Sequence, residues 1–185
     1  MRLEPVDRPP TLLARIASAM MRRQLGKVIT PARVIYNRVP ALYGVGWQLV
    51  KAQRKGLTLA PELRLLVQSW VAMVNHCSFC IDIARASALS DGVSLERIDA
   101  LPEWRTSPLF GGAERAALAY AEEATRSKRV SDETFAALQK HFDDRAIVEI
   151  TFLTALENYY NLLNLPLGIE EDGLCAIARE RLRPA

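Results

Sequence analysis

The chain has 185 residues, of which 50% are hydrophobic and 24% charged, a composition typical of a globular domain with a sizeable core. No uninterrupted apolar stretch approaches the roughly 20 residues that a membrane-spanning helix needs, and residues 1–10 lack the apolar core of a secretory signal. Three cysteines with one close pair do not indicate a disulfide-stapled secreted scaffold, so we expect a cytoplasmic protein.

The net charge of +3 is unevenly distributed along the chain. Residues 1–60 carry eleven Lys or Arg against two acidic residues, a charge of +9, and the remainder carries −6. Such a basic segment is either an arm for nucleic acid or a membrane surface, or a helical appendage packed on an acidic body. Its basic residues are spread out and lack the interleaved aromatic side chains of a stacking platform. We therefore favour the appendage and expect no nucleic-acid or membrane partner.

Helical periodicity runs through nearly the whole chain. Sequence signals mark several helix starts: Thr11 as an N-cap, Thr30-Pro31, Ser131 and Asp143-Asp144. In chain order, the predicted helices cover residues 11–27, 30–38, 42–54, 61–74, 77–88, 94–100, 113–127, 134–141, 144–163 and 172–183. No convincing strand pattern and no strong internal repeat interrupts them. The predicted class is all-α.

A Cys-x-x-Cys motif, Cys77-Ser78-Phe79-Cys80, follows the central predicted helix and lies where the next one begins. Unpaired amides and the positive end of the helix dipole lower the pKa of a thiol at such a position, and the thiolate is the reactive form. Two sulfurs three residues apart on a helical turn can close a disulfide, which permits reversible two-electron chemistry.

Three other interpretations of the pair stay open on the residues alone. The two cysteines could be buried structural residues, which behave as small apolar side chains. They could be half of a zinc site, completed from His76, His141, Cys175 or carboxylates, although no second Cys-x-x-Cys exists. The spacing could also be a coincidence.

The segments around this motif resemble the carboxymuconolactone decarboxylase and alkylhydroperoxidase D superfamily, in its peroxidase-like branch. The resemblance is carried by Leu-Ala-Pro-Glu-Leu-Arg at residues 59–64 and Asn-His-Cys-Ser-Phe-Cys-Ile-Asp at residues 75–82, and covers roughly residues 57–170. It implies an alkylhydroperoxidase D-like helical bundle over residues 57–185, preceded by a basic N-terminal helical extension over residues 1–56. It also implies a homo-oligomer.

The resemblance further implies the chemistry of the pair. In peroxidase members the second cysteine attacks a hydroperoxide and the first resolves it as a disulfide, so Cys80 would be peroxidatic and Cys77 resolving. The implied partners are a small-molecule hydroperoxide and a thiol or protein-dithiol reductant. No Gly-rich nucleotide-binding turn or flavin signature is present, and we expect neither a cofactor nor a metal.

The chain departs from the family pattern at the proton relay. The glutamate twelve residues before the first cysteine is replaced by Leu65, and the histidine four residues after the second by Ala84. Neither side chain carries a proton, whereas such a relay contributes about 10²–10⁴ in rate.

Four other residues are candidates for a supporting role: His76, Asp82, Gln68 and Tyr160. Each has an ordinary alternative. Adjacent helical positions point apart, so His76 would face away from Cys77, and Asp82 would be a carboxylate on the helix surface. Gln68 could orient water or substrate only, and one of the two tyrosines at 159–160 belongs to the core.

The leading functional hypothesis is a peroxidase-like oxidoreductase that cycles Cys77 and Cys80 between dithiol and disulfide. A second keeps the fold without catalysis, as a binding or assembly protein. A third, a lactone decarboxylase-like enzyme, rests on kinship of fold alone, which does not determine function.

Overall fold

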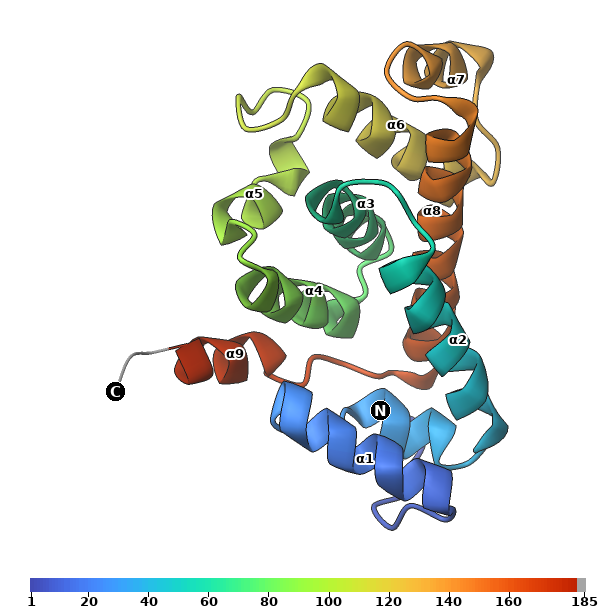
Figure 1. Cartoon of the computed structure of the whole chain (residues 1–185), viewed down its shortest axis with the longest axis vertical. Helices are drawn as coiled ribbons and strands as arrows, with labels where there is room; N and C mark the ends of the chain where they lie inside the picture. Colours follow the sequence, from blue (N-terminus) through green and yellow to red (C-terminus); the bar gives the residue numbers. More distant parts are fainter. Residues whose placement is uncertain (183–185) are drawn as a thin grey trace.

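The computed structural model describes residues 1–182 as a bundle of helices with no strand among them (Figure 1). The α-helices are α1 (Leu12–Leu25), α2 (Ala41–Lys55), α3 (Pro61–Val74), α4 (Ser78–Asp91), α5 (Leu95–Asp99), α6 (Gly112–Ser127), α7 (Asp132–Gln139), α8 (Asp144–Asn164) and α9 (Leu174–Leu182). Short turns of other types are a π-helical turn (Ala32–Tyr36) and two 3₁₀ turns (Leu101–Glu103 and Leu165–Leu167). The predicted all-α class is confirmed. Within the described residues, no helix is both long enough and apolar enough to span a bilayer.

Side-chain caps set several helix starts where the sequence predicted them. Thr11 accepts a hydrogen bond from the Ala14 amide at 3.2 Å, Ser131 accepts one from Thr134, and Asp143 accepts one from Ala146 at 2.8 Å. Each bond satisfies an amide that would otherwise lack a partner in the first helical turn.

The predicted helix over residues 30–38 is only partly correct. Only Thr30 and Pro31 have α-helical backbone there, and a five-residue π-helical turn begins at Ala32. Thr30 does not cap it, because its amide and hydroxyl both donate to the carboxylate of Asp172, at 2.6 and 2.7 Å. A contact across the fold therefore overrides the local capping signal.

Helix α3 is the centre of the bundle and packs against α4, α6 and α8 (Figure 1). Pro61 occupies its first turn, where a missing amide proton costs nothing. The helix contributes to all three apolar clusters of the structure: Val67 to the first, Ala72 to the second and Leu66 to the third. Its C-terminus, where the cysteine motif begins, is therefore held from several sides.

The segment before α3 packs onto the cysteine region. Val34 and Ile35 from the π-helical turn share one buried cluster with Cys77 and Cys80. α1 contacts α9, and Lys27 forms an ion pair with Asp172 at 3.0 Å. The residues around the sulfurs thus come from both ends of the chain as well as from its centre.

Candidate redox site

The turn between α3 and α4 delivers the first cysteine directly to a helix start. His76 has a φ of 55°, in the left-handed region, and its amide donates to the carbonyl of Met73. The amide of Cys77 donates to Ala72 at 2.9 Å. These two bonds make a Schellman motif, which ends α3 and leaves no spare residue before α4.

Cys77 is the N-cap residue of α4 and Cys80 lies in its first turn. The two form a disulfide, with their Cα atoms 5.2 Å apart. Both side chains are buried, with 0% and 4% of their surface exposed. The predicted helix start at the first sulfur is confirmed, and a thiolate formed at either residue would face unpaired amides at the positive end of the helix.

Two asparagine amides of α8 face the sulfur of Cys80. The Nδ2 atoms of Asn161 and Asn164 lie 3.1 and 3.5 Å from Cys80 Sγ. The side chain of Asn75, at the end of α3, donates to Asn161 Oδ1 at 2.8 Å and so fixes which way that amide points. Amide donors favour the charged form of the group that they face, so this arrangement favours Cys80 as the thiolate of the pair.

A buried carboxyl group lies on the other side of the same amide. Asn161 Nδ2 donates to Glu157 Oε1 at 2.7 Å, one helical turn away on α8. Burial raises the pKa of Glu157 to about 7, although hydrogen bonds from the Asn161 and Gln68 side chains act in the opposite direction. Among the described residues Glu157 forms no ion pair. It can therefore hold or release a proton near neutral pH.

Two of the four candidate supporting residues lie beside this carboxyl group. Gln68 on α3 lies near Glu157, and its side-chain amide acts to lower the pKa of that carboxyl group. Tyr160 is partly buried, and its burial together with the nearby Tyr36 and Glu157 raises its pKa. His76, by contrast, is exposed at the turn.

Asp82 lies on α4 but serves the start of another helix. Its carboxylate accepts hydrogen bonds from the amides of Leu174 at 2.8 Å, Cys175 at 2.9 Å and Asp172 at 3.1 Å. It is 7% exposed, so the alternative expectation of a surface carboxylate is wrong. Its oxygen atoms hold the N-terminus of α9 against α4.

The positions of the family relay carry no acid or base. Leu65 packs with the third apolar cluster and not with the cysteines, and Ala84 is a partly buried residue of α4. Trp70 and Trp104 are buried in the third cluster. The third cysteine, Cys175, is free and partly buried.

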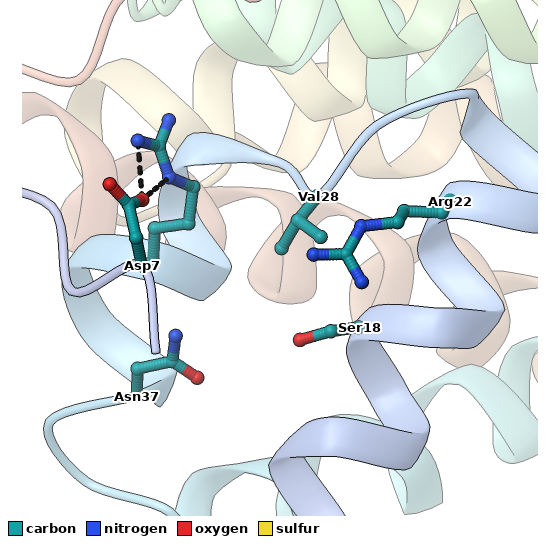
Figure 2. A pocket seen from close by; sticks show the side chains of 6 residues that line it. Asp7, Ser18, Arg22, Val28 and Asn37 are labelled. Atoms are coloured by element: carbon teal, nitrogen blue, oxygen red, sulfur yellow. Dashed lines mark hydrogen bonds and ion pairs between the residues drawn. The ribbon is translucent and has the colours of Figure 1, made fainter. Parts of the chain in front are cut away.

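The described residues form no metal site at the cysteines. Within residues 1–182, no three His, Cys, Asp or Glu side chains are grouped to hold a metal ion. A cavity of about 200 Å³ lies instead in the N-terminal part, lined by Asp7, Ser18, Arg22, Val28, Arg33 and Asn37 (Figure 2). In this cavity Arg33 pairs with Asp7, Asn37 donates to a backbone carbonyl and Ser18 donates to the carbonyl of Ala14.

Comparison with known proteins decides the family. The model of the carboxymuconolactone decarboxylase family matches residues 40–123. The uncharacterised protein YnjA of Escherichia coli is 34% identical over 98% of this chain and 100% of its own length. The chain belongs to this family. The match begins at residue 40 and so includes α2, ahead of the predicted domain start at residue 57.

Solved structures show the same fold. A protein of unknown function from Agrobacterium tumefaciens, provisionally named antioxidant defence protein AhpD, is 25% identical with a TM-score of 0.69, covering 74% of this chain and 94% of its own. The debrominase Bmp8, in a variant with one cysteine replaced by alanine and in complex with 2,3,4-tribromopyrrole, is 19% identical with a TM-score of 0.82, covering 99% and 98%. The predicted alkylhydroperoxidase D-like helical bundle is confirmed.

Sequence reasoning missed three residues of α8: Asn161 and Asn164, which contact Cys80, and Glu157, which contacts Asn161. Glu157, Asn161 and Asn164 are all buried and follow the spacing i, i+4, i+7, which places them on one face of the helix. Three polar side chains on a face that periodicity assigns to the core are a detectable signal. Their partner could not be identified from sequence, because Cys80 lies 81 residues before Asn161.

Proposed function

We propose that this protein is a thiol-dependent oxidoreductase that reduces hydroperoxides with the Cys77–Cys80 pair. The observation that carries the proposal is the pair itself, a buried disulfide at the start of α4 with two amide donors aimed at Cys80. Membership of the family supports it. Cys80 is the attacking thiolate and Cys77 the resolving residue.

The proposed cycle has three steps. The Cys80 thiolate attacks the terminal oxygen of the hydroperoxide, an S–O bond forms, the O–O bond breaks, and the alkoxide takes a proton to leave as an alcohol. The Cys77 sulfur then attacks the Cys80 sulfenic acid; the S–S bond forms, and hydroxide leaves with the proton of Cys77 as water. A small thiol or protein dithiol returns two electrons and two protons to the disulfide.

Mild oxidation of the reduced protein tests the proposal. One equivalent of an organic hydroperoxide should yield a Cys77–Cys80 disulfide, found by mass spectrometry as a linked peptide that dithiothreitol separates. Cys80→Ser should abolish hydroperoxide consumption, and Cys77→Ser should stop at the sulfenic acid. Cys175→Ser is the matched control and should retain wild-type consumption, because Cys175 is outside the disulfide. A pair that stays reduced would refute the proposal and favour a binding or assembly protein.

Reductive dehalogenation is a second candidate for the same dithiol. The structural likeness to the debrominase Bmp8 extends over 99% of this chain, including the N-terminal segment. A dithiol supplies two electrons and two protons, which convert a carbon–bromine bond into carbon–hydrogen and hydrogen bromide as the disulfide forms. Incubation of the reduced protein with 2,3,4-tribromopyrrole should then release bromide, and a hydroperoxide-specific enzyme should release none.

The setting of this activity is part of the proposal. A catalytic dithiol needs a reductant, which suits the cytoplasm, where thiols are kept reduced. Assembly into a homo-oligomer is supported by apolar side chains that the single chain leaves exposed on α1 and α2, among them Leu12 and Trp47.

A further inference from the structure

The acid–base group that the sequence lacks at positions 65 and 84 has a candidate elsewhere in the fold. Glu157 is buried on α8, one amide away from Cys80. Asn161 offers one N–H to the carboxyl oxygen at 2.7 Å and the other to the sulfur at 3.1 Å, while its carbonyl oxygen is occupied by Asn75. A single side chain therefore presents donors to both groups.

We propose that Glu157 and Cys80 share one negative charge through Asn161, and that Glu157 is the proton-holding partner of the reactive thiol. The inference rests on the proposed function of the dithiol. When Cys80 gives its proton to water and becomes a thiolate, the Glu157 carboxyl group takes up a proton from water, so that the buried pair keeps a single negative charge. When the hydroperoxide is cleaved and the thiolate charge is consumed, Glu157 returns its proton to water and the departing alkoxide takes one. Glu157 acts through Asn161 as a positioning residue.

Glu157 and Cys80, which lie on either side of Asn161, do not readily carry a negative charge at the same time. Both groups are buried, and among the described residues no cation pairs with Glu157. A second buried anion would therefore have no ion pair to offset the free energy of its desolvation. Two acids coupled in this way titrate in two steps that belong to the pair rather than to either residue.

The other groups around Glu157 do not supply a competing proton. From α3 it faces the Gln68 amide, which does not titrate. From α4 it faces the dithiol through Asn161. On its own helix the titratable neighbour is Tyr160, whose pKa lies above its ordinary value, so that its phenol stays protonated where Glu157 titrates. The carboxyl group and the thiol are therefore the pair that exchanges charge near neutral pH.

The surroundings of Glu157 differ from those of the other buried glutamate of α8. The other buried glutamate of α8, Glu149, accepts hydrogen bonds from Thr58 and Leu59 amides and from Arg145, and so ties the segment before α3 to α8. Glu157 has a different set of partners, the side-chain amides of Asn161 and Gln68. A buried acid without a cation beside a reactive sulfur is typical of functional sites.

Titration of the thiol tests the inference without any substrate. In a Cys77→Ser, Cys175→Ser background, Cys80 is the remaining thiol, and its ionisation can be followed by thiolate absorbance and by the rate of iodoacetamide alkylation across pH. We expect two steps with Glu157 present and one step in Glu157→Gln. Glu157→Asp, which keeps the acid, should restore two steps. A Glu157→Gln profile that superimposes on the parent would overturn the inference.

Turnover gives a second readout. In the full-length protein with its cysteines intact, Glu157→Gln should lower kcat/KM for hydroperoxide by about 10²–10⁴-fold, and Glu157→Asp should recover part of it. Glu149→Gln is the matched control and should leave both the titration and kcat/KM unchanged. If the wild-type protein consumes no hydroperoxide, the proposed function fails, while the titration still decides whether Glu157 and Cys80 are coupled.

Discussion

Asn161 is the residue on which the geometry around Cys80 depends. Its side chain accepts a hydrogen bond from Asn75 and donates to Glu157 and Cys80, at distances of 2.7 to 3.1 Å. Both N–H groups of the Asn161 amide are therefore in use. Leucine has a similar size and no polar group. Asn161→Leu should therefore leave the packing of α8 intact while removing the donor from the sulfur and from the acid.

We expect Asn161→Leu to raise the pKa of the Cys80 thiol, because hydrogen bonds to a charged form favour it. The same change should cost about 1–3 kcal/mol of stability, since Glu157 and Asn75 each lose a buried partner. Alkylation rates across pH and chemical denaturation measure the two effects. Asn158→Leu is the control: Asn158 bonds Asn75, Thr125 and Thr154 but not the sulfur, so it should lose stability with an unchanged thiol titration. The same Cys80 thiol titration in Asn161→Leu and Asn158→Leu would contradict the role of Asn161 as a donor to the sulfur.

The sequence predicted the paired sulfurs but not the groups that surround them. Cys77 and Cys80 are recognisable because their spacing and their place at a helix start are local properties. The role of Glu157 depends on how α8 packs against α4, which no local pattern specifies. Asp82 shows the converse case, because its place near a helix start indicated an exposed carboxylate, whereas the incoming N-terminus of α9 buries it.

At the scale of elements, α8 holds two buried glutamates whose environments are opposite. Hydrogen bonds from Leu59, Thr58 and Arg145 outweigh the effect of burial and lower the pKa of Glu149 to about 2, whereas burial raises that of Glu157 to about 7. The ordinary value is 4.5 for both. The folded state therefore binds fewer protons than the unfolded state at Glu149 and more at Glu157.

Stability should accordingly depend on pH with opposite signs at the two residues. Glu149 stabilises the fold above about pH 4.5, and this contribution is lost as the pH falls toward 2. The contribution of Glu157 has the opposite sign: it is present below about pH 4.5 and is lost as the pH rises to 7. For the buried Glu157 the loss is about 3 kcal/mol. As the pH rises from about 5 to 8, the free energy of unfolding measured by urea denaturation of the oxidised protein should fall less for Glu157→Gln than for the wild type. Parallel curves would contradict the raised pKa.

The extent of each helix was predictable where the start has its own cap. Thr11, Ser131 and Asp143 accept hydrogen bonds from amides three residues later, an interaction that needs no distant partner. Thr30 carries the same kind of signal and fails, because Asp172, 142 residues later, accepts both of its hydrogen bonds. Local signals therefore predict helix starts except where a distant acceptor competes for the cap.

For the molecule as a whole, the N-terminal segment cannot be treated as a removable arm. Val34, Ile35 and the partly buried Tyr36 and Leu42 pack in the cluster that contains the cysteines. Truncation before Leu57 would uncover Cys77 and Cys80 along with any surface used in assembly, so its outcome could not be assigned to either. Point substitutions on the outer faces of α1 and α2 separate the two, because those side chains do not touch the sulfurs.

The outer faces of α1 and α2 are the basis for predicting that the protein forms a homo-oligomer. Leu12 and Ile16 on α1 are 73% and 51% exposed, and Trp47 on α2 is 59% exposed. The helices α1 and α2 are in contact, and large exposed apolar side chains on neighbouring helices indicate an interaction surface. We predict that a second copy of this chain covers it. Light scattering after size exclusion should give a multiple of 20.7 kDa for the wild type. Trp47→Glu should shift the mass toward the monomer, whereas Val148→Glu, at a residue 66% exposed on α8, should not. A wild-type mass of a single chain at micromolar concentration would exclude the oligomer and leave α1 and α2 free for another partner.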